Sequence, residues 1–244
     1  LYLSMKKESL DLFFENFFSG KWFMSMQKIF DINSHEVVGG ELLLRVYDED
    51  ILKNGDYFPD AFYDCRFNNL TLGILRKLKE ALAETPDIFP NHLSINLVPI
   101  NLDSIEVLND LFEIAETFRA LNKNFVLEIS EIFVHEDFEK FLPKAEQLQK
   151  AGALIGLDDY GATDLEIDDL DFFPLDFVKL DRSMSTSVSG LNSKFHQNMI
   201  ATAGKRNLML IAEGVEEDDM LHSLKSFGYN FVQGFMFHKP EKFI

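Results

Sequence analysis

The sequence has almost no cysteine and no long apolar run. Cys65 is the single cysteine among 244 residues, so the chain cannot form an internal disulfide and a reducing compartment is expected. No apolar run approaches the ~18 residues that a membrane-spanning helix needs. The start of the chain shows no signal-peptide pattern. Because the chain begins with Leu1 and Tyr2 rather than Met, we expect it to be a piece of a longer protein.

Positive charge is also scarce. The chain has 23 Lys+Arg against 41 Asp+Glu, which gives a net charge of −18. This balance disfavours a nucleic acid polymer as a partner, because DNA and RNA require a basic surface. It is compatible with a small phosphate ligand, since bound divalent cations reverse the local sign of the charge. Hydrophobic residues make up 46% of the chain, and its 25 Phe are spread along it, which predicts an ordinary globular core.

Apolar runs of strand length alternate with helical patterns along the whole chain. The expected strands are residues 22–30, 37–45, 92–97, 125–129, 153–159, 177–181, 208–213 and 229–234. The expected helices are residues 8–18, 61–83, 104–121, 137–150, 192–206 and 217–227. Eight strands in a chain of this length predict an α/β fold, a (β/α)₈ barrel. A turn at residues 33–35 joins the first two strands as a hairpin, so we expect an antiparallel first strand.

No low-complexity linker or block of charge divides the chain. We therefore expect a short N-terminal helix and linker segment at residues 1–20, followed by one barrel domain at residues 21–244. Residues 54–60 are expected to form a loop, and residues 163–171 a short acidic segment.

Seven polar residues lie in or just after apolar strands, towards their carboxyl ends, each on a different strand apart from one adjacent Asp pair. They are Asn96, Glu128, Asp158, Asp159, Lys179, Glu213 and Gln233. In a (β/α)₈ barrel the carboxyl ends of the strands converge on one face, where active sites lie. Taken singly, each residue could be a helix cap or a solvated side chain, but one shared site accounts for all of them. Glu41 lies in the second strand with apolar residues on both sides, so a solvent-exposed position is less favourable for it there.

Asp158 and Asp159 are adjacent at the end of an apolar run. Successive side chains of a strand point to opposite faces, so both acids can face one site only if the backbone turns there. Gly161 supplies a turn. Two carboxylates held together repel unless a cation lies between them. The alternative is that the pair caps a following helix, because Asp is a favoured capping residue.

The chemistry of these residue types favours hard divalent cations. Several carboxylates and an amide oxygen, without a convergent set of Cys or His, indicate Mg²⁺ or Mn²⁺ rather than Zn²⁺ or copper. The acids exceed what one ion needs, so we expect two ions that share a bridging carboxylate, an arrangement that performs in-line displacement at phosphorus. A buried Lys can stabilise developing charge or act as a base. These residues therefore predict a metal-dependent phosphodiesterase.

The same residues lie in seven short motifs that follow one another along the chain. The motifs are Glu41-Leu42-Leu43-Leu44-Arg45, Ser94-Ile95-Asn96-Leu97, Leu127-Glu128-Ile129-Ser130-Glu131, Asp158-Asp159-Tyr160-Gly161, Lys179-Leu180-Asp181, Glu213-Gly214-Val215-Glu216 and Gln233-Gly234-Phe235. Their order and spacing, from about residue 22 to residue 240, resemble those of the EAL domains, a family of bacterial cyclic di-GMP phosphodiesterases. The first motif resembles the Glu-Ala-Leu-Leu-Arg signature from which these domains take their name.

The resemblance implies a role for each site residue. Glu41, Asn96, Glu128 and Asp158 would hold one Mg²⁺ or Mn²⁺ ion, and Asp158, Asp159 and Glu213 the second. Lys179 would contact the attacking water and the phosphate, so the implied catalytic residues are Lys179, Glu41, Asp159 and Glu216. The implied substrate-binding residues are Arg45, Gln27, Gln233 and Asp181. Glu131 would anchor the loop after Asp159.

The resemblance also implies a reaction, partners and a location. The reaction opens one phosphodiester bond of cyclic di-GMP with water and gives linear pGpG. The implied partners are cyclic di-GMP, a second copy of the chain in a homodimer, and a fused sensory or GGDEF-type domain, and the implied location is the bacterial cytoplasm.

Two departures from the family pattern leave an alternative open. Leu42 replaces the signature Ala, and Ala162-Thr163-Asp164 replaces a Gly-containing loop with small hydroxyl residues. The alternative is a weak or inactive EAL domain that acts as a cyclic di-GMP sensor or a protein-interaction module.

Overall fold

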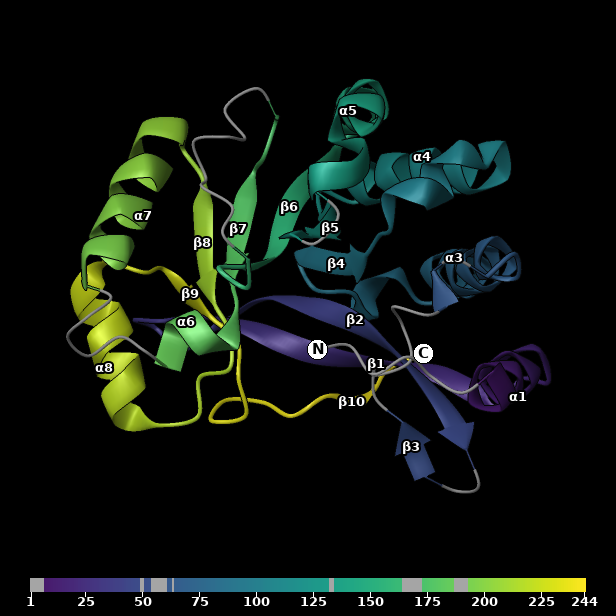
Figure 1. The fold of residues 1–244 in the computed structure, drawn as a ribbon, viewed down its shortest axis with the longest axis horizontal. Helices are drawn as coiled ribbons and strands as arrows, with labels where there is room; N and C mark the ends of the chain where they lie inside the picture. The colour runs from purple at the N-terminus through teal and green to yellow at the C-terminus, as the bar shows by residue number, and fades with distance from the viewer. Residues whose placement is uncertain are drawn as a thin grey trace.

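The chain folds into a closed barrel of eight strands with helices around it (Figure 1). The computed structural model describes residues 7–48, 51–53, 61–62, 64–131, 134–163, 173–186 and 193–244. The barrel strands are β1 (Trp22–Asp31), β2 (Val37–Asp48), β4 (His92–Asn96), β5 (Asn124–Ser130), β6 (Ala153–Tyr160), β7 (Phe177–Leu180), β8 (Met209–Ala212) and β9 (Phe231–Val232). They pair in that order, and β9 and β2 both pair with β1, so the ring closes. The predicted (β/α)₈ architecture is confirmed.

The first strand runs antiparallel to its neighbours, as predicted. Strand β1 pairs antiparallel with β2 from Trp22↔Val46 to Ile29↔Gly39 and, after a register shift, at Phe30↔Val37. It also pairs antiparallel with β9 at Phe30↔Val232. The remaining neighbours in the ring pair in parallel. The Asp31 carboxylate stabilises the hairpin turn, because its Oδ1 accepts hydrogen bonds from the backbone N–H groups of Asn33 and Ser34 at 2.8 Å each.

Two short strands extend the sheet beyond the prediction. Strand β3 (Ile51–Lys53) pairs antiparallel with the end of β2. Strand β10 (Glu241–Lys242) pairs antiparallel with the middle of β1. The backbone N–H of Met24 also donates to the carbonyl of Ile244 at 2.8 Å, which fixes the last residue against the barrel. Strands of two or three residues show no alternation that a sequence reading can detect.

Seven α-helices are described around the strands. They are α1 (Lys7–Phe18), α3 (Phe67–Glu84), α4 (Ile105–Ala120), α5 (Val134–Ala151), α6 (Arg182–Thr186), α7 (Ser193–Arg206) and α8 (Asp218–Phe227). Two 3₁₀ turns lie at Pro86–Ile88 and Pro99–Asp103. Within the described residues no helix is both long and apolar enough to cross a membrane.

Helix α3 begins at Phe67, later than the predicted start at residue 61. Asp64 causes the difference, because its Oδ1 accepts the backbone N–H of Arg66 at 2.8 Å and closes a turn there. Helix α6 was not predicted, since five residues carry too little periodicity. The predicted loop at residues 54–60 and most of the predicted acidic segment at residues 163–171 lie outside the described residues.

Helix α1 belongs to the same core as the barrel. Phe13, Phe14 and Phe17 are buried in the large hydrophobic cluster that lies between the sheet and its helices. The ring of Phe17 stacks on Trp22 of β1 with centroids 4.6 Å apart. The boundary that we predict at residue 20 therefore separates two segments that share one hydrophobic core.

A small apolar cluster forms the floor inside the barrel. Its buried members are Ile29, Val126, Phe177 and Ile211, from four different strands. Gly156 allows this packing, because a Cβ atom there would lie 2.0 Å from the ring of Phe177. The floor lies on the amino-terminal side of the polar side chains, since Val126 and Phe177 precede Glu128 and Lys179 on their strands.

Candidate active site

The alternation of each strand places polar side chains directly above the apolar floor. Side chains two residues apart point to the same face of a strand. Val126 is followed by Glu128, Phe177 by Lys179, and Ile211 by Glu213, each two positions later. The polar residue therefore points into the barrel on every one of these strands. The predicted convergence of strand-end residues has this simple cause.

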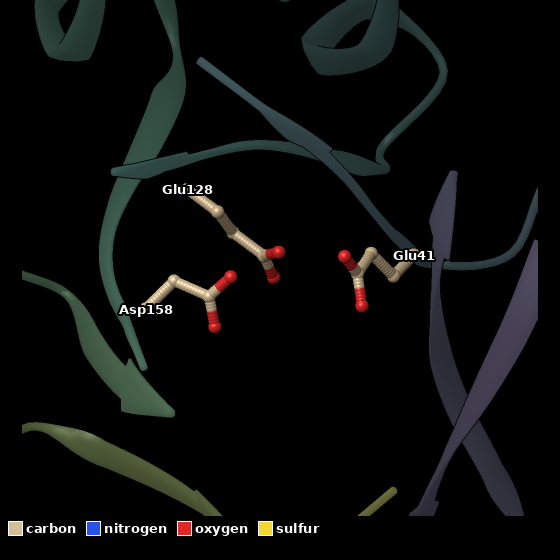
Figure 2. A group of neighbouring side chains, drawn as sticks. All are labelled: Glu41, Glu128 and Asp158. Carbon is tan, nitrogen blue, oxygen red and sulfur yellow. The ribbon is translucent and has the colours of Figure 1, made fainter. Parts of the chain in front are cut away.

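The ammonium of Lys179 lies among four carboxylates. Its Nζ is 2.6 Å from Glu213 Oε1, 3.0 Å from Glu128 Oε2, and 3.1 Å from both Glu41 Oε2 and Asp158 Oδ1. Figure 2 shows three of these carboxylates, those of Glu41, Glu128 and Asp158, pointing towards one another from different strands. The Lys179 side chain is only 1% exposed. The site thus places four carboxyl groups around one buried ammonium.

Amide side chains hold Glu41 in position. Asn96 Nδ2 donates to Glu41 Oε1 at 2.8 Å, and Gln233 Nε2 donates to Glu41 Oε2 at 2.8 Å. Gln233 Nε2 also lies 3.2 Å from Gln27 Oε1, and Gln27 Nε2 donates to the carbonyl of His238 at 3.3 Å. The structure therefore brings Asn96, Gln233 and Gln27 together with the carboxylates. His238 has no place in the sequence prediction, because its contribution is a backbone carbonyl.

The backbone turns between the two adjacent acids, as their shared site requires. Asp159 has a φ of +57°, a left-handed conformation that Asp tolerates better than most residues. The register between β6 and β7 shifts between Leu157 and Tyr160. Ser130 Oγ donates to Asp159 Oδ2 at 3.2 Å. The resemblance implies no role for Ser130, although its place at the end of β5, beside the acidic end of β6, is a sequence signal for one.

Glu131 fixes the start of the loop after the Asp pair. It is fully buried. Its Oε2 accepts the backbone N–H groups of Gly161 and Thr163 at 3.0 Å each, and its Oε1 accepts Thr163 Oγ1 at 2.7 Å. Gly161 has a φ of +99°, which only glycine adopts readily. Of the altered loop, Ala162 and Thr163 are described, and Asp164 lies outside the described residues.

Two predicted residues, Asp181 and Glu216, lie at the edge of the site. Asp181 accepts the backbone N–H of Ser183 at 2.8 Å, and its charge raises the pKa of nearby Asp159 after the larger effect of burial. Glu216 pairs with the guanidinium of Arg182 at 2.8 Å, and its side chain is 35% exposed. A catalytic role for Glu216 stays a prediction.

A cavity of about 350 Å³ opens beside the carboxylates. Arg45, Asn96 and Asp159 line its polar part, and apolar side chains such as Leu42 and Phe67 line much of the rest. Leu42, the departure from the family signature, follows Glu41 on β2 and therefore points to the opposite face of the strand. The larger side chain is thus accommodated in the cavity wall and the core, where it is 2% exposed.

Burial and mutual repulsion shift the acidity of the cluster. Burial, with smaller effects of neighbouring acids, raises the pKa of Glu213 to about 8 and that of Asp158 to about 6. Burial also raises the pKa of Glu128 well above its usual range. The pKa of Glu41 is lowered: burial opposes this, but the Lys179 ammonium and the bonds from Gln233 and Asn96 prevail. The same four acids hold the pKa of Lys179 well above its ordinary value despite burial.

The donor set fits two divalent cations. Ligand oxygens of Glu41, Glu128 and Asp158 lie within 4.8 Å of one another, and so do those of Asp158, Asp159 and Glu213. Asp158 belongs to both groups. Glu128 Oε1 is buried without a hydrogen-bond partner among the described residues, which leaves a lone pair for an ion. All these donors are hard oxygens, which suit Mg²⁺, Mn²⁺ or Ca²⁺.

The protein is thus a (β/α)₈ barrel with an antiparallel first strand and a cluster of acidic side chains inside the barrel. The family follows from the sequence, since the model of the EAL domain family matches residues 14–240. The chain belongs to the EAL domain family.

The chain is also similar in sequence to proteins named as cyclic di-GMP phosphodiesterases and in fold to solved EAL domains. The chain is 26% identical over 229 residues to a probable cyclic di-GMP phosphodiesterase, PdeN of Escherichia coli, covering 90% of this chain and 43% of PdeN. The EAL domain of Xanthomonas citri FimX, solved with c-diGMP, superposes with a TM-score of 0.82 at 15% identity and covers 97% of this chain and 96% of FimX's. A manganese and cy-diGMP complex of Klebsiella pneumoniae BlrP1 gives 0.76 at 22% identity, over 90% of this chain and 56% of that one. The chain spans less than half the length of curated relatives that it matches.

Proposed function

We propose that this chain hydrolyses cyclic di-GMP to linear pGpG with the help of two divalent cations, Mg²⁺ or Mn²⁺. The observation that carries the proposal is the pair of carboxylate groups that share Asp158 and surround Lys179. The family and the names of its relatives supply the substrate class. A cytoplasmic location, a homodimer and a fused sensory or GGDEF-type domain belong to the same proposal.

The residues divide into ion ligands and groups that act directly. Glu41, Asn96, Glu128 and Asp158 would hold one ion, and Asp158, Asp159 and Glu213 the other. When bound, such ions lower the pKa of a water molecule and stabilise negative charge on phosphate oxygens. Asn96 and Gln233 orient Glu41 by donating hydrogen bonds to its carboxylate. Glu131 holds the backbone that follows Asp159 by accepting its N–H groups.

Lys179 and Arg45 supply the positive charge of the chain itself. The ammonium of Lys179 stabilises the charge that develops when water adds to phosphorus. Arg45 lines the cavity beside Asp159 and offers its guanidinium to a second phosphate oxygen. In the reaction a P–O bond to water forms and one ring P–O bond breaks. The products are a free 3′-hydroxyl and a terminal 5′-phosphate.

Incubation of the purified protein with cyclic di-GMP tests the proposal. With Mn²⁺ or Mg²⁺ we expect a single product, pGpG, on ion-exchange chromatography, and with EDTA we expect the substrate back intact. Intact substrate in the presence of either ion, together with tight binding of the nucleotide by calorimetry, would instead support the sensor alternative. Absence of binding would support a protein-interaction module.

The affinity for Mg²⁺ should rise with pH between pH 6 and pH 8. Glu213, with its pKa raised to about 8, and Asp158, with its pKa raised to about 6, are partly or wholly protonated at the lower end of this range. A carboxyl group must lose its proton before it binds an ion, so the ion binds better as pH rises through these values. We expect the Kd measured by calorimetry to fall by about tenfold or more from pH 6 to pH 8. A constant Kd without proton release would contradict the assignment.

A further inference from the structure

Lys179 contacts members of both carboxylate groups. Its Nζ contacts Glu41, Glu128 and Asp158, which are all three members of one carboxylate group. It also contacts Glu213, a member of the second group, at 2.6 Å. The ammonium therefore reaches both predicted ion sites through the carboxylates that would ligate the ions.

We propose that Lys179 is a built-in counter-ion that holds the ligand carboxylates together and competes with divalent cations for them. Four acids within contact of one point repel strongly in a buried site unless a positive charge offsets them. Lys179 supplies that charge permanently, on a side chain that is 1% exposed. The proposal rests on the proposed function only in treating the two carboxylate groups as ion sites.

Two opposite effects follow when a divalent cation enters. The ligands are already gathered by the ammonium, so little rearrangement is needed. The ammonium, however, repels the entering ion and shares its ligands, so ion affinity stays below what the carboxylates alone would give. When ions bind, Lys179 would therefore lose part of its contacts with the carboxylates and lie beside the ions. This makes it a positioning residue for the ion ligands, in addition to its contact with the phosphate.

The structure offers a matched control lysine. Lys123 Nζ donates to the backbone carbonyls of Pro86 and Phe89 at 3.0 and 2.6 Å. It is partly buried and makes no described contact with the carboxylate cluster. Replacing it by Met removes a bonded ammonium without changing the charge among the carboxylates, so Lys123→Met reports loss of stability alone.

The test compares Lys179→Met, Lys179→Arg and Lys123→Met with the parent protein by calorimetry with Mn²⁺ at pH 8 and by thermal unfolding. We expect Lys179→Met to bind Mn²⁺ about tenfold or more tightly than the parent, because a competing charge is gone. We expect it to unfold at a lower temperature without the ion and to show a larger Mn²⁺-induced rise in Tm. Lys179→Arg and Lys123→Met should keep the parent's affinity within about threefold.

Equal or weaker Mn²⁺ binding by Lys179→Met would overturn the inference. Failure of the parent to bind Mn²⁺ at all would overturn both the inference and the proposed function. Tighter binding by the variant, with no pGpG formed by the parent, would support the inference and overturn the proposed function alone. If Lys179→Met does not fold at any Mn²⁺ concentration, a crystal structure of the parent with Mn²⁺ decides. Loss of at least two of the four Nζ contacts supports the inference, and retention of all four overturns it.

Discussion

Replacing Glu41 by Gln is expected to lower kcat for cyclic di-GMP hydrolysis by about 10²-fold or more. The change keeps the shape of the side chain but removes the charge of a proposed ion ligand. It also puts an amide donor among three donors, since Asn96, Gln233 and Lys179 all donate to Glu41. A buried donor left without an acceptor costs about 1–3 kcal/mol. Initial rates of pGpG formation with saturating Mn²⁺, together with Tm, measure both effects.

Glu36→Gln is the matched control for this substitution. Glu36 is exposed in the turn that joins β1 to β2, so the same chemical change there should leave kcat and Tm unaltered. An active Glu41→Gln protein, within about threefold of the parent's kcat, would show that Glu41 is not an essential ion ligand. Loss of activity in both variants would point to the hairpin rather than to the carboxylate.

Truncating Phe14 to Ala should lower the free energy of unfolding by about 3–5 kcal/mol. Phe14 is fully buried. Its ring stacks on Phe18 at 6.0 Å and lies under the Arg66 guanidinium, 4.3 Å from the ring centroid. Since domains are stable by only about 5–15 kcal/mol, a loss of this size is a large fraction of the total. Urea unfolding followed by circular dichroism measures it.

Phe18→Ala, on the same helix, provides the comparison. Phe18 is 51% exposed, so its truncation should cost about 1 kcal/mol or less. If Phe14→Ala were as mild as Phe18→Ala, α1 would be a separable segment, as the boundary at residue 20 implies. A large difference between the two variants would make α1 part of the barrel's folding unit.

The barrel could be predicted from the sequence because each strand carries its own signal. The run before Asp158 is apolar throughout, which is typical of a strand buried on both faces. The turn before Val37 predicts a hairpin and therefore an antiparallel first strand. Strand β10 could not be predicted, since Glu241 and Lys242 form a strand only because β1 offers them a partner edge. Helix α3 starts late because the bond from Arg66 N–H to Asp64 competes with helix formation, a local effect that periodicity does not contain.

The members of the site were predictable, but their mutual contacts were not. Alternation along β7 places Lys179 inside the barrel, yet nothing in the sequence shows that its Nζ reaches four carboxylates at once. That contact depends on how the strands close into a ring. The turn at Asp159 was predictable in principle, because two adjacent acids on a strand need it in order to share a site. The ion pair of Glu216 with Arg182 depends on the loop after β8 and carries no sequence signal.

Anomalous X-ray scattering from a crystal of the protein with Mn²⁺ and cyclic di-GMP would show whether two ions bind at these carboxylates. We expect two manganese peaks. One would be ligated by Glu41, Asn96, Glu128 and Asp158, and the other by Asp158, Asp159 and Glu213, with a phosphate of the nucleotide beside both. Nucleotide bound with no manganese at these carboxylates, or manganese bound elsewhere on the chain, would contradict it.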